Sequence, residues 1–309
     1  MQTFCVTLRP QTAFGSPLLG ETLFGQMCWT IRRLWGEEAL RTLLVGYDDG
    51  QPFAVLSDAM PVGFVPLPTM PNYLWQDDDG SNRKYLKKKA WIPFSALAED
   101  PFNWQTSAKS DEEVCPEGLR AEQITLHNTI NRMTGTTGKG QFAPFMQPQT
   151  WLNTQVPLTV VAVIDESRFS VKQLIEALTY IGLSGFGRDA SVGLGKFTVD
   201  DEVTTIGPQV PSTTHLTLAS CVLAGVEDLV AEKTFYRTKT HFGRHGDELA
   251  LLGHPFKYPI LLATAGAVVT TATPQAQAFV GRGLKQVSYA QSEAVHQGYS
   301  PVLPLTQVF

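Results

Sequence analysis

The apolar positions of the N-terminal segment follow two different periods, which predict a strand, a helix and a second strand. Residues 3–8 (TFCVTL) are rich in β-forming side chains and predict the first strand. Apolar residues then recur at helical spacing as far as Trp35, and we expect Ser16 to be the N-cap and Pro17 the first helical residue. Residues 51–58 (QPFAVLSD) predict the second strand.

A second strand–helix–strand group follows a long intervening segment. Residues 156–164 (VPLTVVAVI) form a near-continuous β-branched run, which predicts a buried strand. Residues 170–173 (SVKQ) match a capping box, and the apolar residues that follow on one face predict a helix over 171–182. A glycine-rich stretch at 185–195 then leads into a strand at 196–199.

Between these two groups, residues 66–150 lose any apolar period. The segment contains many of the chain's prolines, an acidic run at 77–79 and a basic run at 83–89. Because it offers little periodic apolar surface of its own, it predicts a long insertion that gains part of its order from a partner.

The order β-α-β, insertion, β-α-β is that of a ferredoxin-like fold. We therefore predict an α+β protein with two ferredoxin-like (RRM-like) domains in tandem. The first domain is placed at 1–205, with the insertion at about 66–150, and a degenerate second copy at 206–309. In the second copy strands are expected at 214–223, 234–240, 258–264, 267–271 and 301–305.

Composition agrees with two folded domains. The chain has 309 residues, of which 43% are hydrophobic and 17% charged, so it can bury a core and is not disordered as a whole. Its formal net charge is −5, which argues against a free-standing nucleic-acid binder. A subunit that meets RNA through one basic strip and protein elsewhere stays compatible with this charge.

The chain also lacks signals for export or membrane insertion. No basic segment followed by an apolar stretch opens the sequence, so we expect no secretory signal. The longest mostly apolar stretch, Tyr258 to Val269, is too short to span a bilayer. The four cysteines form no CxxC pair, which favours small buried residues of a cytosolic protein. We expect a soluble, cytoplasmic protein with no membrane partner.

The motifs of common enzymes are missing or stand in the wrong context. His241 and His245 have the i, i+4 spacing of helical metal ligands, but glycines interrupt the segment and no Glu follows His241. The acidic run at 77–79 is more typical of a solvated loop than of a magnesium site. Residues 185–190 match the dinucleotide fingerprint GxGxxA, yet a helix precedes them and a strand follows, the reverse of the required order. We therefore expect no catalytic residue, metal or cofactor.

The glycine-rich stretch is the first candidate for RNA binding. Glycines allow backbone N–H groups to approach phosphates, and cationic side chains flank the stretch. Phosphate contacts of this kind hold a strand in register and carry little sequence information. A glycine-rich turn that only packs against the sheet explains the loop equally well. The candidate residues are Gly185, Gly187, Arg188, Ser191, Gly193, Gly195 and Lys196.

Two further segments are candidates. The start of the first helix, at Ser16, should lie at the same end of the fold as the glycine-rich stretch, and a helix N-terminus attracts phosphate. Glu21 opposes this attraction, and a plain capped helix is the alternative. Residues 127–135 (HNTINRMTG) are polar and basic, as in segments that recognise single-stranded RNA, although a solvated loop explains them better when taken alone.

Six segments carry a family resemblance through their order and spacing. They are 15–25 (GSPLLGETLFG), 52–53 with 56–61, 88–93 (KKAWIP), 127–135, 185–197, and 295–299 (VHQGY) with Pro304. Together they resemble the RAMP superfamily of CRISPR proteins, and within it the fourth subunit of the type III-A (Csm) complex, a relative of the Cas5-type subunits. The resemblance covers most of the chain.

This resemblance implies a non-catalytic subunit that holds the 5′ repeat-derived tag of the CRISPR RNA (crRNA). It also implies docking on the large polymerase-like Cas subunit and contact with a neighbouring backbone RAMP subunit. The glycine-rich stretch, together with Ser16 and Thr22, would line the tag. Asn131 and Arg132 would belong to a thumb that kinks the RNA where tag meets guide. Glu21 stands where the family is expected to have Asp.

Two other functions stay open. A RAMP-type endoribonuclease that processes CRISPR precursor RNA would need a general acid or base, for which His127 and His241 are the candidates. Neither has a partner that the sequence makes visible. A subunit of a neighbouring effector type, Cmr or type IV, would have different partners but nearly the same mechanism.

Overall fold

The first half of the chain forms an antiparallel sheet covered by two helices. The computed structural model describes residues 1–309 except 72–73, 75–82, 208, 252 and 306–309, so the acidic run at 77–79 lies outside the described residues. The strands follow the order β10-β1-β9-β2, with β11 also paired to β1 and β3 to β9. The elements are β1 (Gln2–Pro10), α1 (Gly20–Trp35), α2 (Glu37–Leu44), β2 (Ala54–Leu56), β3 (Met60–Pro61), β9 (Leu158–Ile164), α6 (Val171–Ser184), β10 (Phe197–Val199) and β11 (Thr204–Ile206).

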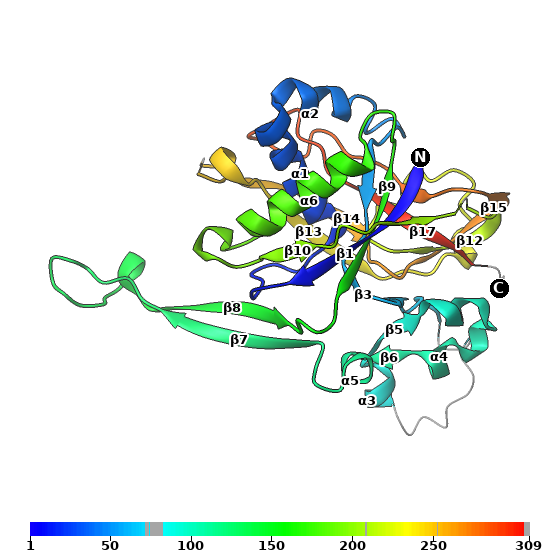
Figure 1. Cartoon of the computed structure of the whole chain (residues 1–309), viewed down its shortest axis with the longest axis horizontal. Coiled ribbons are helices and arrows are strands. Elements are labelled where there is room, and N and C mark those ends of the chain that lie inside the picture. The colour runs from blue at the N-terminus through cyan, green and yellow to red at the C-terminus, as the bar shows by residue number, and fades with distance from the viewer. Residues whose placement is uncertain (72–73, 75–82, 208, 252, 306–309) are drawn as a thin grey trace.

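This sheet has the predicted β-α-β, insertion, β-α-β order. Alternation along β1 places Phe4, Val6 and Leu8 on the face that α1 and α6 cover. Cys5 and Val161 on the opposite face belong to a second core, which the sheet shares with the C-terminal half. The sheet is therefore buried on both faces, between the two helices and the rest of the chain (Figure 1).

The two helices begin for different physical reasons. The capping box expected for α6 is present, because Ser170 Oγ accepts the N–H of Gln173 and the Gln173 side chain accepts that of Ser170. The expected start of the first helix is wrong. Helix α1 begins at Gly20 rather than Pro17, and Ser16 is not its N-cap. Leu19 precedes the helix in an extended conformation and caps it with no side-chain bond.

The insertion is more ordered than its sequence suggests. Its first part forms a sheet of order β4-β5-β6 with short helices around it. Ile92 and Trp104 are fully buried and share a core with Leu216 and Leu218 of the C-terminal half. The prediction that this region depends on a partner for its order is wrong here, because its isolated apolar residues pack against a distant part of the same chain. These elements are β4 (Phe64–Pro66), α3 (Arg83–Leu86), β5 (Lys89–Pro93), α4 (Trp104–Ser107), β6 (Lys109–Ser110) and α5 (Asp111–Val114).

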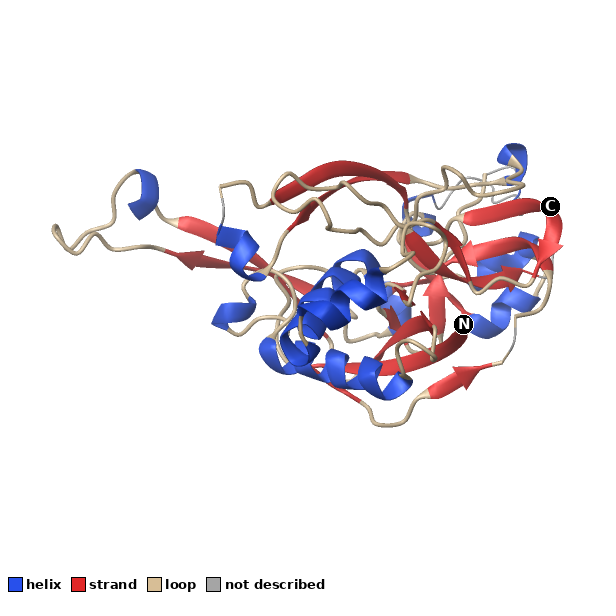
Figure 2. Cartoon of the chain, turned by 90° about the horizontal axis from the view of Figure 1, so that it is seen from above, coloured by secondary structure: helices blue, strands red, loops and turns tan. Residues whose placement is uncertain are grey.

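The second part of the insertion is a long β-hairpin. Strands β7 (Arg120–His127) and β8 (Phe145–Leu152) pair over eight residues each, from Arg120–Leu152 to His127–Phe145. The hairpin projects from the body on the side away from both labelled chain ends, as Figures 1 and 2 show from two directions. A ribbon with two exposed faces is thus the most protruding feature of the molecule.

The C-terminal half consists of strands and short 3₁₀ turns. Its main sheet has the order β15-β12-β17-β16, and β13 and β14 form a separate hairpin. The described part of 206–309 contains no α-helix. Its strands are β12 (Ser212–Thr217), β13 (Thr238–Arg244), β14 (Phe256–Ala263), β15 (Val268–Gln275), β16 (Phe279–Gly281) and β17 (Tyr299–Leu305). Among the described residues, 3₁₀ turns lie at Phe94–Ala98, Pro101–Asn103, Gly140–Phe142, Ala190–Val192, Ala231–Lys233 and Asp247–Leu251.

The last part of the chain completes the first core. The Gln297 side chain accepts the N–H of Leu56 at 2.9 Å and donates to the Leu56 carbonyl at 2.7 Å, so it pairs with β2 as a further strand would. Tyr299 is 1% exposed and donates its hydroxyl to the carbonyl of Tyr47 at 2.7 Å. The two halves are therefore not independent bodies.

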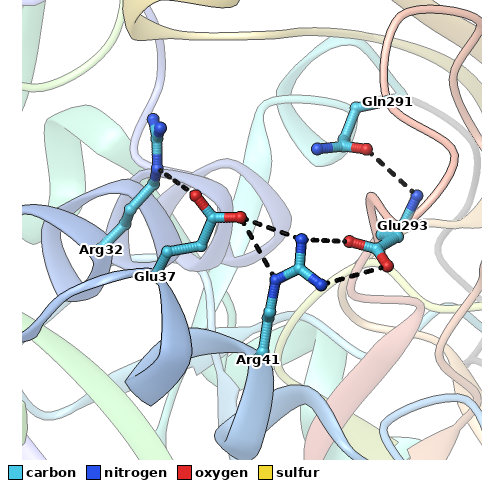
Figure 3. Close-up of polar contacts among 5 residues, drawn as sticks. All are labelled: Arg32, Glu37, Arg41, Gln291 and Glu293. Carbon is cyan, nitrogen blue, oxygen red and sulfur yellow. Dashed lines mark hydrogen bonds and ion pairs between the residues drawn. The ribbon is translucent and has the colours of Figure 1, made fainter.

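A chain of exposed ion pairs joins the same regions at the surface. Figure 3 shows Arg41 of α2 between Glu37, at 3.0 Å, and Glu293, at 3.1 Å. Arg32 of α1 lies 3.6 Å from Glu37, and the Glu293 N–H donates to the Gln291 side chain. Exposed pairs of this kind are screened by solvent, so they orient the segment before β17 more than they stabilise it.

In the part of the chain that the structure describes, every helix is too short or too polar to cross a lipid bilayer.

We predict opposite effects for two helical Gly→Ala substitutions. A Cβ at Gly182 of α6 would lie 2.1 Å from the carbonyl oxygen of Phe197, so Gly182→Ala should lower the free energy of unfolding by about 1–3 kcal/mol. Gly25 of α1 has no heavy atom within 4 Å of an added Cβ, so Gly25→Ala should raise it by up to about 1 kcal/mol. Urea denaturation of both variants measures the difference, and equal effects would contradict the packing of α6 on β10.

Candidate nucleic-acid interface

A side-chain amide of the first helix holds the glycine-rich loop that joins α6 to β10. Gln26 Nε2 donates to the Gly185 carbonyl at 2.7 Å, and Gln26 Oε1 accepts the Gly187 N–H at 2.9 Å. The next amide, that of Arg188, donates to Ser16 Oγ at 3.0 Å. Ser16, expected as a helix cap, therefore bonds instead to the loop that was predicted to lie beside it.

Close approach of neighbouring atoms requires glycine at several positions of this loop, of which Gly187 and Gly195 are two. Gly187 has φ = +74°, and a Cβ there would lie 2.7 Å from Ser16 Cβ. Gly195 has φ = +76°, and a Cβ there would lie 2.2 Å from the carbonyl oxygen of Phe186. Residues that carry a side chain rarely adopt such φ values, so the loop conformation depends on glycine at these positions.

Many of the loop's amides are already bonded within the protein. The Gly195 N–H donates to the Ala13 carbonyl at 2.7 Å, and the Lys196 N–H to Thr12 Oγ1 at 2.9 Å. The Gly193 N–H donates to Ala190, and those of Gly187 and Arg188 are held as described. A phosphate cradle built from these amides is therefore not present in this conformation. The polar groups that the loop presents to solvent include the exposed side chains of Arg188, Ser191 and Lys196, and Val192 is exposed beside them.

The N-terminus of α1 is likewise occupied by the chain's own carboxylate. The Gly20 N–H donates to Asp58 Oδ1 at 2.8 Å, and Thr22, half-buried in the first turn, donates its N–H to the Leu19 carbonyl. Glu21 is fully buried, and its Oε1 lies 2.7 Å from Lys239 Nζ and 3.7 Å from His241 Nδ1. The anion that the helix dipole attracts is thus supplied by Asp58, 38 residues further along the chain.

Burial, and second the nearby Glu21 carboxylate, raise the pKa of Asp58 to about 7. The N–H of Gly20 and the charge of Lys239 act in the opposite direction. Burial lowers the pKa of both His241 and His296, whose rings lie 5.2 Å apart. Helix α1 therefore meets the hairpin β13–β14 through a cluster of titratable groups.

A cleft of about 420 Å³ lies where the loop meets the root of the projecting hairpin. It places Ser16 and Arg188 side by side. The Arg188 guanidinium donates to the carbonyl of Pro148 in β8 and pairs with Asp189 at 3.2 Å. The rest of the lining comes from the segment before α1 and from both hairpin strands, namely Phe14, Gly15, Pro17, Glu122, Gln123, Ile124, Pro148, Gln149 and Thr150.

The predicted thumb residues lie apart from this cleft. Asn131 and Arg132 belong to the segment that connects β7 to β8 at the far end of the hairpin (Figure 1). Asn131 pairs with Thr136, and its side chain accepts the N–H of Met133 at 2.9 Å. The structure therefore separates the predicted residues into a group at the hairpin root and a group at its tip.

Sequence reasoning missed the hairpin's exposed apolar face. Ile124, Leu126 and Met146 are 62%, 76% and 68% exposed, and they lie on one face because Leu126 pairs with Met146 and Ile124 with Pro148. The available signal was the alternation of apolar and polar residues at 124–126 (ITL) and at 146–148 (MQP). Gln26 was also missed, and a single glutamine on a helix gives no signal from sequence alone.

The two candidate catalytic histidines have different surroundings. His127 is exposed and stacks on Phe145 with the ring centroids 5.5 Å apart. His241 is mostly buried beside Glu21, a partner that the sequence did not reveal. Among the described residues, no three His, Cys, Asp or Glu side chains are grouped so that they could hold a metal ion.

Comparison with solved structures identifies the fold to which this architecture belongs. A chain of the Csm3–Csm4 subcomplex of the type III-A CRISPR–Cas interference complex superposes with a TM-score of 0.63 at 15% identity, covering 99% of this chain and 100% of that one. A chain of a Csm1–Csm4 cassette bound to AMPPNP gives 0.61 at 14% identity, with 100% of each covered. Csm4 is the component common to both assemblies. This chain has the RAMP-type fold of these Csm complexes.

The expected RAMP resemblance is thereby confirmed at the level of the fold. The mixed architecture with antiparallel sheets agrees with the predicted α+β class. No protein-family model and no curated protein sequence matches the chain. The Csm-type fold is therefore recognised from the arrangement of helices and strands, while the sequence identity to these chains is only 14% and 15%.

We predict that Asp58 makes stability depend on pH. The pKa of Asp58 is higher in the folded protein than in the unfolded chain. The stability that Asp58 contributes is therefore present at acid pH and is lost as the pH rises from about 4 to 7. Asp58→Asn keeps an oxygen for the Gly20 N–H and cannot ionise. The variant should therefore gain stability relative to the unsubstituted protein between pH 5 and pH 8.

Urea denaturation at the two pH values tests this. The lowered histidine pKa values act in the other direction, because they cost stability as pH falls below 6.5, and they are common to both proteins. A stability difference that is the same at both pH values would show that Asp58 is already ionised in the folded state.

Proposed function

We propose that this chain is a non-catalytic RNA-binding subunit of a type III-A CRISPR interference complex, and that it holds the 5′ repeat-derived tag of crRNA. The observation that carries the proposal is the cleft that joins Ser16 and Arg188 to the root of a projecting hairpin. The end-to-end likeness to chains of Csm3–Csm4 and Csm1–Csm4 assemblies supports it.

The groups in and beside the cleft suit single-stranded RNA. Arg188, Ser191 and Lys196 present donors for phosphates, which position a strand without reading its sequence. Gly185, Gly187, Gly193 and Gly195 act by shaping the loop. Ser16 and Thr22 lie on the segment that the loop contacts. The apolar face of the hairpin can pack against splayed bases, and Asn131 and Arg132 would contact RNA at its tip, where the thumb kinks the strand between tag and guide.

Partners account for the acidity of the chain. With a net charge of −5, the protein would bind RNA mainly once assembled. We infer that it docks on the large polymerase-like Cas subunit and on a neighbouring backbone RAMP subunit, in the cytoplasm. The named neighbours are complexes of Csm4 with Csm1 and with Csm3, which supports both contacts.

We also infer that the chain descends from two ferredoxin-like units in tandem, divided between residues 205 and 206. In each half the first long strand is central, since β1 lies between β9 and β10 as β12 lies between β15 and β17. The second unit would then have lost its helices, which makes it the degenerate copy. A subunit of a Cmr or type IV complex would share these features, and copurifying subunits would distinguish it.

We predict that Arg188→Ala combined with Lys196→Ala weakens binding of a tag-bearing RNA about tenfold, and lowers the slope of log Kd against log salt by up to about two, because fewer counterions are released. Fluorescence anisotropy on the assembled complex at several salt concentrations measures both. Lys172→Ala, an exposed lysine at the opposite end of α6, is the matched control and should change neither. Unchanged binding in the double variant would remove this loop from the RNA site.

The endoribonuclease alternative has its own test. The proposal predicts that the purified protein leaves repeat RNA intact with and without divalent metal. A discrete, metal-independent cut that disappears in His127→Ala would replace the binding function by a catalytic one. His241→Ala serves as a second variant, because His241 has a carboxylate neighbour in Glu21.

A further inference from the structure

The hairpin β7–β8 is tied to the body at its root on two sides. On one side Arg120 Nε bonds to Asp111 Oδ2 of α5 at 2.6 Å, and Leu152 packs on the first core. The other side faces the glycine-rich loop. The backbone of Phe14 pairs with that of Thr150 through two hydrogen bonds of 2.8 and 2.9 Å. The Arg188 guanidinium adds a bond to the neighbouring Pro148 carbonyl. Both contacts come from segments that flank the glycine-rich loop or bond to it, so the loop is part of what aims the hairpin.

The position of Arg188 in turn depends on Gln26. The two bonds of the Gln26 amide fix the chain at Gly185 and Gly187, immediately before Arg188. Gly187 has a positive φ and packs against Ser16, which receives the Arg188 N–H. An amide is suited to this role because it offers one donor and one acceptor to two peptide groups at once.

We propose that Gln26 is a positioning residue that sets the direction of the hairpin through the glycine-rich loop and Arg188. Both of these side-chain hydrogen bonds of Gln26 go to the loop, so the effect of Gln26 on RNA is indirect and rests on the RNA-binding function proposed above. The path runs from the middle of α1, through Gly185–Gly187, to the guanidinium of Arg188 and the carbonyl of Pro148.

Hydrogen exchange on the full chain tests the path without RNA. Gln26→Met keeps the side-chain length and removes both bonds, so the Gly187 and Thr150 amides should exchange about tenfold faster, while the amides of β9 stay protected. Gln26→Glu keeps the acceptor for the Gly187 N–H and should leave that amide protected. Gln155→Met, at an exposed glutamine, is the control. Faster exchange at Gly187 with unchanged exchange at Thr150 would overturn the proposal.

RNA binding then separates positioning from direct contact. In Gln26→Met the cationic side chains remain, so the affinity for a fluorescein-labelled, tag-bearing RNA should fall about fivefold with the salt slope unchanged. Arg188→Ala should lower the slope by about one. Unchanged affinity in Gln26→Met, with reduced affinity in Arg188→Ala, would refute the positioning role alone. If Arg188→Ala also left binding unchanged, the proposed RNA function would fail. Hydrogen exchange would still show whether Gln26 positions the hairpin.

Discussion

The glycine-rich loop at the hairpin root is held by two hydrogen bonds from one side-chain amide, that of Gln26. They join the middle of the first helix to a loop more than 150 residues away in the chain. Because the loop is rich in glycine, it has many conformations open to it in the unfolded chain, and ordering it is costly in entropy. Fixed donors and acceptors on α1 and on the segment before it select one of these conformations. We infer that the position of Arg188, and with it the loop side of the cleft and of the hairpin root, follows from that selection.

Local signals were sufficient where the chain bonds to its sequence neighbours. The strand β1 and helix α6 are predictable because alternation and a capping box act within a few residues. The start of α1 is not, since its capping carboxylate, Asp58, comes from beyond the helix and its connection to β2. The insertion was mistaken for a partner-dependent segment for the same reason. Its buried residues, such as Trp104, find their contacts in the C-terminal half, and no window of sequence contains both sides of that core.

The candidate site was predictable in its composition and not in its chemistry. Glycines followed by cations correctly indicate a shaped, basic loop, and Ser16 and Arg188 do meet there. The sequence cannot tell how the amides are used, because that depends on acceptors such as Thr12 Oγ1 and the Ala13 carbonyl. The result is a loop whose backbone amides are largely bonded within the protein and whose cationic side chains are exposed to solvent. A surface of this kind suits the RNA-holding role proposed above, in which charge and shape matter more than base sequence.

The contribution of Gln297 and Tyr299 to the first core has a consequence for how the protein is made. A ribosome releases the N-terminal sheet and both of its helices well before residue 297 emerges. During that interval the edge strand β2 lacks the side chain that pairs with Leu56, and Tyr47 lacks one of its aromatic neighbours, Tyr299. An incomplete core of this kind exposes apolar surface and an open strand edge, both of which promote aggregation. The nascent chain should therefore be a client of chaperones until β17 is translated.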